Sequence, residues 1–264
     1  MMHKTCFTAL LAGALGLAAS SPVLASETCS ARSPAHRVGL LELYTSEGCS
    51  SCPPADRWLS GLRQQPGVGE QFVPLALHVD YWDDIGWKDI YAQSRFGHRQ
   101  RDLVAAAGST VVYTPQFFLQ GKSVRPDRSA GLLATELAAL AQRPAVADIV
   151  LTQSRSGPRQ LALKVEASLH AESGGQPASL FIALYQNGLQ TQVKAGENSG
   201  ATLRHDFVVR LWSGPKAIPA SGKLAETVVF TLPGSAPASD FGVAAFVQRG
   251  GKEVLQALAR PVCV

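Results

Sequence analysis

The sequence predicts an α/β domain followed by a small all-β domain, and three observations support this prediction. Apolar runs of strand length alternate with helical patterns between residues 38 and 142. From Asp148 onward, runs with a period of two residues are separated by Gly, Pro, Ser and Asn. A Cys-Ser-Ser-Cys motif, Cys49 to Cys52, stands between the first apolar run and the first helical pattern. We expect the domain boundary between Arg143 and Ala147.

The first 25 residues have the parts of a signal peptide, which we assign to residues 1–25. Lys4 precedes the apolar run Ala9–Ala19, and Val23-Leu24-Ala25 is a small-residue cleavage pattern. No later stretch approaches ~20 uninterrupted apolar residues, so we expect no membrane span in the mature chain. The protein is therefore expected to be exported, either to the periplasm or as a secreted protein.

The predicted α/β domain, residues 36–144, has the element order β-α-β-α-β-β-α. Its strands are short apolar runs, and we expect them at Val38–Thr45, Phe72–Asp80, Gln116–Gln120 and Ser123–Arg125. Its helices follow a 3.6-residue pattern with stops at Gly or Pro, and we expect them at Ala55–Leu62, Ile90–Ala107 and Ser129–Gln142.

The predicted C-terminal domain, residues 148–264, consists of strands. Its clearest period-2 runs are LALKVEASL, SLFIALYQNG, LRHDFVVRLW and ETVVFTL. Strands at this spacing, without helical patterns between them, indicate a small antiparallel sandwich or barrel.

Composition excludes some classes of protein. The 264 residues are 46% hydrophobic and 17% charged, which is typical of globular proteins. The 24 basic and 20 acidic residues are scattered, so a nucleic-acid partner is not indicated. Ser46, Ser50 and Ser51 lack the G-x-S-x-G surroundings of a hydrolase nucleophile. We expect no cofactor.

Four cysteines remain once Cys6 is removed with the signal peptide. An even number in an oxidising compartment permits full pairing, in any of three connectivities. The short spacing suggests Cys49 with Cys52, which leaves Cys29 for Cys263 as a structural disulfide. The alternative is that Cys29 and Cys263 are free or pair between chains.

A C-x-x-C motif after a strand and at the start of a helix suits thiol-disulfide exchange. The two sulfurs can form a bridge, the helix start can stabilise a thiolate, and the second thiol can resolve a mixed disulfide. Thr114-Pro115 stands directly before a predicted strand, QFFLQGK. This arrangement resembles the thioredoxin fold, which places a cis-proline at the start of such a strand against its C-x-x-C motif. The resemblance implies a cis bond at Thr114-Pro115, close to the cysteines, and cis bonds are essentially confined to X-Pro.

Four blocks of the sequence together resemble a family of exported thioredoxin-like proteins, the domain of unknown function 1223 family. These blocks are YTSEGCSSCPPAD, HVDYWDDIGWKD, VYTPQFFLQGK and KAGENSGATLRHDFVVR. The resemblance implies a thioredoxin-like fold with an appended β domain, but no proven reaction. Its last block is expected to be a hairpin turn, with either a structural role or a role in docking onto the first domain.

By resemblance to thioredoxins at large, Cys49 is the exposed attacking cysteine and Cys52 the resolving one. Thr114 and Pro115 then form the loop that receives a substrate chain by backbone pairing. Glu42, on the first strand, lies where thioredoxins often keep a buried acid that handles the proton of the resolving cysteine. The alternative for Glu42 is a surface salt bridge.

Pro53 and Pro54 modify this picture. Because proline lacks a backbone N–H, we expect the regular helix to begin at Cys52 or Pro53 and Cys49 to lie in the preceding loop. Nearby Glu47 and Asp56 are expected to raise the pKa of the Cys49 thiol. We therefore predict a less stabilised thiolate than in strongly oxidising proteins.

The segment His78–Asp89 allows three interpretations. Tyr81, Trp82 and Trp87 are candidate substrate contacts beside the C-x-x-C. The segment is otherwise a capping insertion, with tryptophans over the core and a helix at Asp84–Tyr91. A minority alternative is a copper site formed by Cys49, Cys52 and His78, which are soft or borderline ligands.

The sequence thus predicts an exported thiol-disulfide oxidoreductase that reduces or isomerises disulfides. Its partners are expected to be cysteine-containing exported proteins and an unidentified redox partner. The first alternative is a non-catalytic binding protein in which Cys49-Cys52 is a structural disulfide. The second is a copper-handling protein.

Overall fold

The computed structural model describes residues 1–3, 28–127, 129, 131–171 and 176–263. The predicted signal peptide, from residue 4 onward and with Cys6 inside it, lies outside the described residues. No helix in the described ranges is long and apolar enough to cross a membrane.

The predicted fold class, an α/β thioredoxin-like domain followed by a small all-β domain, is wrong. The described chain is mostly β-structure, and its largest sheet has eight strands in the order β14-β13-β8-β11-β3-β2-β4-β5. These strands are β2 (Gly39–Thr45), β3 (Phe72–His78), β4 (Gln116–Leu119), β5 (Lys122–Val124), β8 (Ala178–Gln186), β11 (Val208–Ala217), β13 (Phe241–Arg249) and β14 (Glu253–Pro261).

The joint between the two halves of this sheet lies at β11 and β3. The two strands are parallel, with Val208 opposite Ala76. The backbone N–H of Ala76 donates to the carbonyl oxygen of Phe207 at 2.8 Å. One sheet therefore runs through both predicted domains, because the edge of β3 is paired with a strand from far along the sequence.

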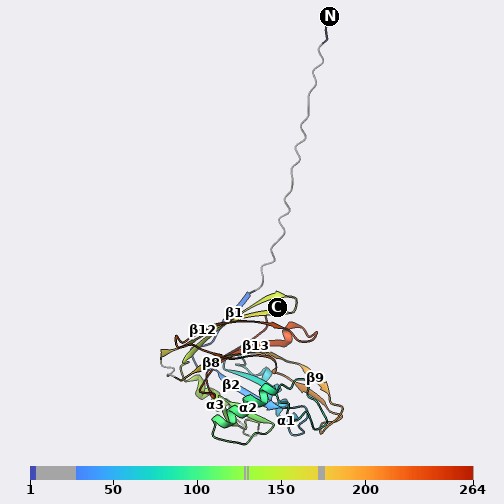
Figure 1. Ribbon diagram of the computed structural model, residues 1–264, viewed down its shortest axis with the longest axis vertical. Coiled ribbons are helices and arrows are strands. Elements are labelled where there is room, and N and C mark those ends of the chain that lie inside the picture. The colour runs from blue at the N-terminus through green and yellow to red at the C-terminus, as the bar shows by residue number, and fades with distance from the viewer. Residues whose placement is uncertain (4–27, 128, 130, 172–175, 264) are drawn as a thin grey trace.

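A second sheet contains the N-terminal strand. It is antiparallel, with the order β1-β6-β7-β12. Its strands are β1 (Thr28–Arg32), β6 (Ala147–Gly157), β7 (Gln160–Leu169) and β12 (Lys223–Thr231), and a separate hairpin is formed by β9 (Leu189–Gln192) and β10 (Thr202–His205). In Figure 1, β1 and β12 lie on the side of the molecule opposite the helices.

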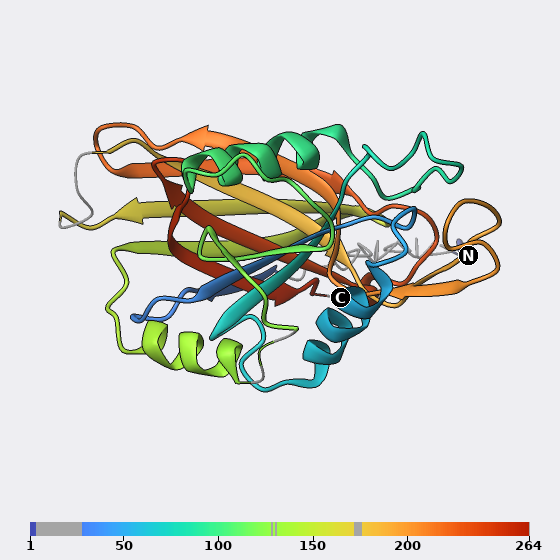
Figure 2. The same cartoon turned by 90° about the horizontal axis from the view of Figure 1, so that it is seen from below.

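Three α-helices are present in the described residues: α1 (Pro53–Gly61), α2 (Ser94–Ala106) and α3 (Leu132–Ala141). Figure 2 shows α2 on one side of the sheet and α1 and α3 on the other. The expected helix at Asp84–Tyr91 is wrong, since these residues form turns. The side chain of Asp89 accepts from the N–H of Tyr91 at 2.8 Å, which stabilises a turn and delays α2 until Ser94.

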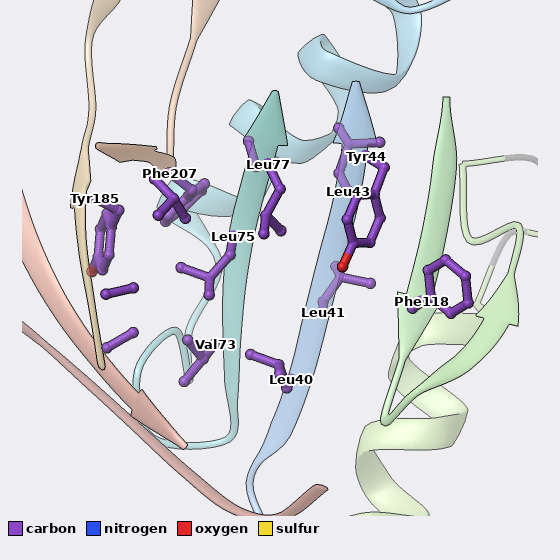
Figure 3. Packing of buried hydrophobic residues seen from close by; sticks show 14 of the residues in the cluster. Leu40, Leu41, Leu43, Tyr44, Val73, Leu75, Leu77, Phe118, Tyr185 and Phe207 are labelled. Atoms are coloured by element: carbon purple, nitrogen blue, oxygen red, sulfur yellow. The ribbon is translucent and has the colours of Figure 1, made fainter. Parts of the chain in front are cut away.

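Side chains on the strands alternate between two apolar cores. In β8, Leu180, Ile182 and Leu184 pack against the second sheet, whereas Phe181 and Tyr185 point into the core that contains β2 and β3. Figure 3 shows the core that contains β2 and β3, where Tyr185 and Phe207 lie in one row with residues of β3, β2 and β4. The two halves of the sequence therefore share a core as well as a sheet.

Candidate functional site

Cys49 and Cys52 form a disulfide bond at the start of α1, with their Cα atoms 5.4 Å apart. Helix α1 begins at Pro53 with Cys52 as its N-cap, which confirms the predicted start. Both cysteines have an exposed fraction of 0%. The expectation that Cys49 is exposed is therefore wrong, because a loop from the second half of the chain covers it.

The covering loop, residues 193–201, connects β9 and β10. The side-chain amide of Asn198 donates to the carbonyl oxygens of Glu47 at 2.8 Å and of Cys49 at 3.0 Å. The backbone N–H of Ser50 donates to Oε2 of Glu197 at 3.0 Å. This loop belongs to the block KAGENSGATLRHDFVVR, and its Glu-Asn pair binds the disulfide loop directly.

Thr114 and Pro115 lie beside the disulfide. The peptide bond between them is cis, as predicted. The hydroxyl of Ser51 donates to the carbonyl oxygen of Thr114 at 3.4 Å and lies 3.3 Å from Sγ of Cys49. Trp82 donates through Nε1 to Oγ1 of Thr114 at 2.7 Å. The two cysteines and the cis-proline loop, far apart in sequence, therefore meet in one place.

A buried cluster of five titratable side chains adjoins the disulfide: Glu47, Asp56, His78, Asp89 and His205. None is more than 5% exposed. Nδ1 of His78 lies 2.7 Å from Oδ2 of Asp89. Nε2 of His205 lies 3.3 Å from Oε1 of Glu47, and Nδ1 of His205 lies 3.7 Å from Oδ2 of Asp56. The two imidazole rings are perpendicular, with centroids 4.9 Å apart.

Burial and charge act in different directions on this cluster. Burial alone lowers the pKa of His78, but Asp89, Asp56 and Glu47 together raise it above its ordinary value. Burial opposes ionisation of Asp89, but His78 and two backbone N–H groups hold its pKa below the ordinary value. Burial raises the pKa of Asp56, and His205 offsets this only in part. Of the two aspartates, Asp56 is thus the one that holds a proton more readily than usual.

Several polar atoms of this cluster have no hydrogen-bond partner. They are Oε1 of Glu47, Oδ2 of Asp56, Nε2 of His78, and both ring nitrogens of His205. Buried polar atoms are rarely left unpaired in folded proteins, so an unpaired group often marks a catalytic role or an unseen ligand. The ring nitrogens of His205 face Oε1 of Glu47 and Oδ2 of Asp56 at the 3.3 and 3.7 Å distances given above, without the geometry of a hydrogen bond.

Glu42, the acid predicted from the sequence, points away from this cluster. Its carboxylate accepts two hydrogen bonds from Arg99, at 2.7 and 3.1 Å, and a third from the hydroxyl of Tyr44 at 3.2 Å. Arg99 is on α2, and its guanidinium lies 4.9 to 5.3 Å from the centroids of three aromatic rings. Glu42 therefore forms a buried ion pair with Arg99 on the α2 side of the sheet.

The three predicted substrate contacts have different surroundings. Tyr81 is 39% exposed, and its hydroxyl donates to Oε1 of Gln100 at 3.1 Å. Trp82 contacts the cis-proline loop through Thr114. Trp87 donates through Nε1 to Oε2 of Glu47 at 2.9 Å and thus belongs with the buried cluster.

The copper alternative has no support from the geometry. Cys49 and Cys52 are bonded to each other, and Nδ1 of His78 is engaged by Asp89. In the part of the chain that the structure describes, no group of three or more His, Cys, Asp or Glu side chains is arranged to hold a metal ion. Cys49, Cys52 and His78 are therefore not assigned as metal ligands.

A second disulfide joins Cys29, on β1, to Cys263, two residues after β14. The backbone N–H of Cys263 donates to Oε1 of Gln153 at 3.3 Å, and Gln153 is the residue opposite Cys29 on β6. This bond closes the chain over a separation of 234 residues.

Sequence reasoning named Asp56 as a charge near Cys49 and Asp89 as the end of the segment His78–Asp89, but it did not place them in a cluster with two histidines. Asp56 carries one local signal, since it lies one helical turn after Cys52. His205 and Asn198 lie in the block KAGENSGATLRHDFVVR, for which docking onto the first domain was one of two expectations. The hydrogen bonds of Asn198 and Glu197 to the disulfide loop agree with that alternative.

Comparisons with known proteins agree with the extent of this fold. A family model described as "Protein of unknown function (DUF1223)" matches residues 40–248. A crystal structure of a protein from Agrobacterium tumefaciens is 25% identical, with a TM-score of 0.57, and the match covers 84% of this chain and 94% of that one.

HBP35 of Porphyromonas gingivalis is 17% identical, with a TM-score of 0.65, and the match covers 87% of this chain and 76% of that one. At this identity the likeness concerns the fold alone. No curated protein matches the chain.

Proposed function

Since the chain belongs to the family of proteins of unknown function DUF1223, whose name assigns no reaction, we propose its function from the site itself. In this proposal the protein is an exported thiol-disulfide oxidoreductase that reduces or isomerises disulfide bonds of other exported proteins. The observation that carries this proposal is the Cys49-Cys52 disulfide at the start of α1, beside the cis Thr114-Pro115 loop.

The proposed reaction starts from the reduced pair. The thiolate of Cys49 attacks one sulfur of the partner's disulfide, the partner's S–S bond breaks, and its other sulfur leaves as a thiolate. Cys52, as a thiolate, then attacks Sγ of Cys49 and releases the second partner sulfur. The partner gains two electrons and two protons, and a dithiol redox partner restores the reduced pair. Isomerisation uses the same first step, after which a different thiolate of the partner attacks its own sulfur in the mixed disulfide, forms a new S–S bond within the partner and releases Cys49 as a thiolate, with no net transfer of electrons.

The covering loop determines access to the sulfurs. Since both cysteines are fully buried, a partner reaches them only when Asn198 and Glu197 release the disulfide loop. The same burial favours the second candidate function, a binding protein in which Cys49-Cys52 is a permanent structural disulfide. The two candidate functions differ in whether Cys49-Cys52 is repeatedly reduced and reoxidised.

Export is part of the proposal. Two disulfide bonds are typical of oxidising compartments such as the periplasm or the extracellular space. The signal-peptide pattern of the sequence supports the same location.

A trapping experiment tests the function. Cys52→Ala should accumulate a mixed disulfide between Cys49 and a natural partner in the exporting cell, since resolution is blocked. Mass spectrometry identifies the partner, and Cys49→Ala is the matched control that should trap nothing. A redox titration with thiol alkylation adds the equilibrium measurement. A pair that stays oxidised below about −300 mV behaves as a structural disulfide and would refute the enzymatic function.

A further inference from the structure

The resolving cysteine has no ordinary route for its proton. Cys52 is fully buried, so its thiol does not exchange a proton directly with bulk water. A helix start normally stabilises a thiolate through free backbone N–H groups. Here the first two helical positions are Pro53 and Pro54, which have none, and the next N–H, that of Ala55, donates to the carbonyl oxygen of Cys52. Formation of the Cys52 thiolate therefore requires a base from elsewhere.

Asp56 is in position to supply that base. It lies four residues after Cys52, and both side chains are on the buried face of α1. Side chains on a helix tilt toward its N-terminus, so the carboxyl group of Asp56 leans toward the turn that holds Cys52. Its Oδ2 atom has no hydrogen-bond partner. Burial favours the protonated form of this carboxyl group, whereas Nδ1 of His205, 3.7 Å from Oδ2, favours the ionised carboxylate, so the group is able to exchange a proton.

The groups that face Asp56 come from four other parts of the chain. His205 is on β10, with Nδ1 3.7 Å from Oδ2 of Asp56. His205 in turn lies 3.3 Å from Glu47, in the loop after β2. His78, at the end of β3, and Asp89, after β3, form the paired part of the cluster. The one imidazole next to Asp56 is therefore oriented between two carboxylates.

We propose that Asp56 accepts the proton of the Cys52 thiol when Cys52 attacks the mixed disulfide, and that His205 positions the Asp56 carboxylate for this transfer. The inference rests on the proposed exchange function and adds the residue that moves its proton. The Cys52 S–H bond breaks, and its proton goes to an oxygen of Asp56. The sulfur electron pair forms the bond to Sγ of Cys49, and the partner sulfur leaves with the electrons of the mixed disulfide. In the reverse direction Asp56 returns the proton to Cys52.

The two steps of exchange can be separated with dithiobis(nitrobenzoic acid), a small aromatic disulfide, as the probe. Attack by Cys49 of the reduced protein releases one coloured nitrothiobenzoate, and attack by Cys52 on the resulting mixed disulfide releases the second. Stopped-flow absorbance gives a rate for each phase. The proposal concerns only the second phase.

Asp56→Asn should slow the second phase by about 100-fold near neutral pH, which is the usual size of a general-base effect. The rate of the variant should rise with pH, because the Cys52 thiolate that attacks must then be formed by solvent base. The first phase should not slow, since loss of the Asp56 charge can only favour the Cys49 thiolate. His205→Gln should slow the second phase by roughly tenfold and move its pH profile in the same direction. Asp102→Asn, at an exposed position on α2, is the control that should change neither phase.

The outcomes separate the inference from the function on which it rests. If the wild type shows two phases and Asp56→Asn has the same second-phase rate and pH profile as the wild type, the proton transfer to Asp56 is refuted but the proposed exchange function is not. If the reduced wild type releases no nitrothiobenzoate, both the proposed exchange function and the proton transfer to Asp56 are refuted. If the second-phase rate of Asp56→Asn is lowered by the same factor at every pH, the effect of the substitution is structural, and the proton transfer to Asp56 is again refuted.

A measurement on the wild-type protein covers the case in which Asp56→Asn does not fold. Redox infrared difference spectra should contain the carbonyl band of a carboxyl group that changes protonation when Cys49-Cys52 is reduced. The band should shift in His205→Gln. Spectra with no carboxyl band at any pH overturn the proposal.

Discussion

The His78-Asp89 pair shows how single residues support the site. The 2.7 Å contact between Nδ1 and Oδ2 is fully buried, and the same carboxylate accepts from the backbone N–H of Glu47 at 2.9 Å. Glu47 comes two residues before Cys49 in the loop that carries the disulfide. Asp89 therefore ties the end of β3 to the disulfide loop.

Asp89→Asn should destabilise the protein by about 3 kcal/mol, because removing one partner leaves the other charge buried and unpaired. The lowered pKa of Asp89 gives stability that is present above the ordinary Asp pKa of 3.8 and is lost as pH falls through the folded value. The raised pKa of His78 gives stability that is present below 6.5 and is lost as pH rises through the folded value.

The difference between wild type and Asp89→Asn should thus be largest between about pH 4 and 6.5 and smaller on either side. Urea denaturation at a series of pH values measures this difference. Asp84→Asn, at an exposed position in the same segment, is the control with an expected effect within ±0.5 kcal/mol. A difference independent of pH would contradict the ion-pair explanation.

At the scale of elements, we expect the covering loop to control how readily the disulfide is reduced. Asn198 makes two hydrogen bonds to the disulfide loop, and both end on carbonyl oxygens. Loss of two ordinary hydrogen bonds costs about 2 kcal/mol, which corresponds to roughly a 30-fold larger open population. The contacts of the loop to the disulfide loop are polar, whereas Val193 at its start is buried and Gly196 packs closely against Trp87.

Asn198→Ala should therefore speed the reduction of Cys49-Cys52 by a small phosphine reductant, by roughly 30-fold if opening limits the rate. Alkylation with mass detection follows the free thiols with time. Ser199→Ala is the matched control, since Ser199 donates only within the loop, to the carbonyl oxygen of Lys194 at 3.3 Å. Equal reduction rates for Asn198→Ala and wild type would show that the loop does not limit access.

Local features of the site could be predicted from the sequence, and features that depend on distant pairing could not. The helix start at Pro53 follows from proline's missing N–H, whereas the cis bond before Pro115 was expected from the resemblance to thioredoxins, since most X-Pro bonds are trans. Most strands of the first half also begin within a residue or two of the predicted positions, because apolar runs mark them. The sequence could not predict on which face of the sheet the Glu42 side chain lies, because Leu41-Glu42-Leu43 belongs to a strand that is buried on both faces.

At the scale of the whole molecule, the error in fold class has one cause. A period-2 run shows that a segment is a strand but does not show which strand it pairs with. The C-terminal runs were expected to pair among themselves, yet β11 joins β3 and β1 joins β6. The covering loop and His205 come to the cysteines through the same long-range pairing. The sequence suggested that this block could dock onto the first domain, but not which residues it would contact.

The shared sheet predicts that the first half does not fold alone. A chain that ends at Pro144 loses β11 and leaves the edge of β3 unpaired next to the site. It also loses Phe181, Phe207 and Phe246 from the apolar core that β2 and β3 require. Exposed apolar surface of this kind leads to aggregation or a loosely packed state.

The fragment 26–144 should therefore show no sharp thermal unfolding transition, whereas the mature chain from residue 26 should unfold in a single transition. Circular dichroism against temperature compares the two, and amide NMR spectra show whether the fragment has dispersed signals. A fragment with a cooperative transition and dispersed signals would mean that the second half is an independent addition. In that case His205 and the covering loop would be dispensable for the fold around Cys49 and Cys52, and their role would be confined to the chemistry of the disulfide.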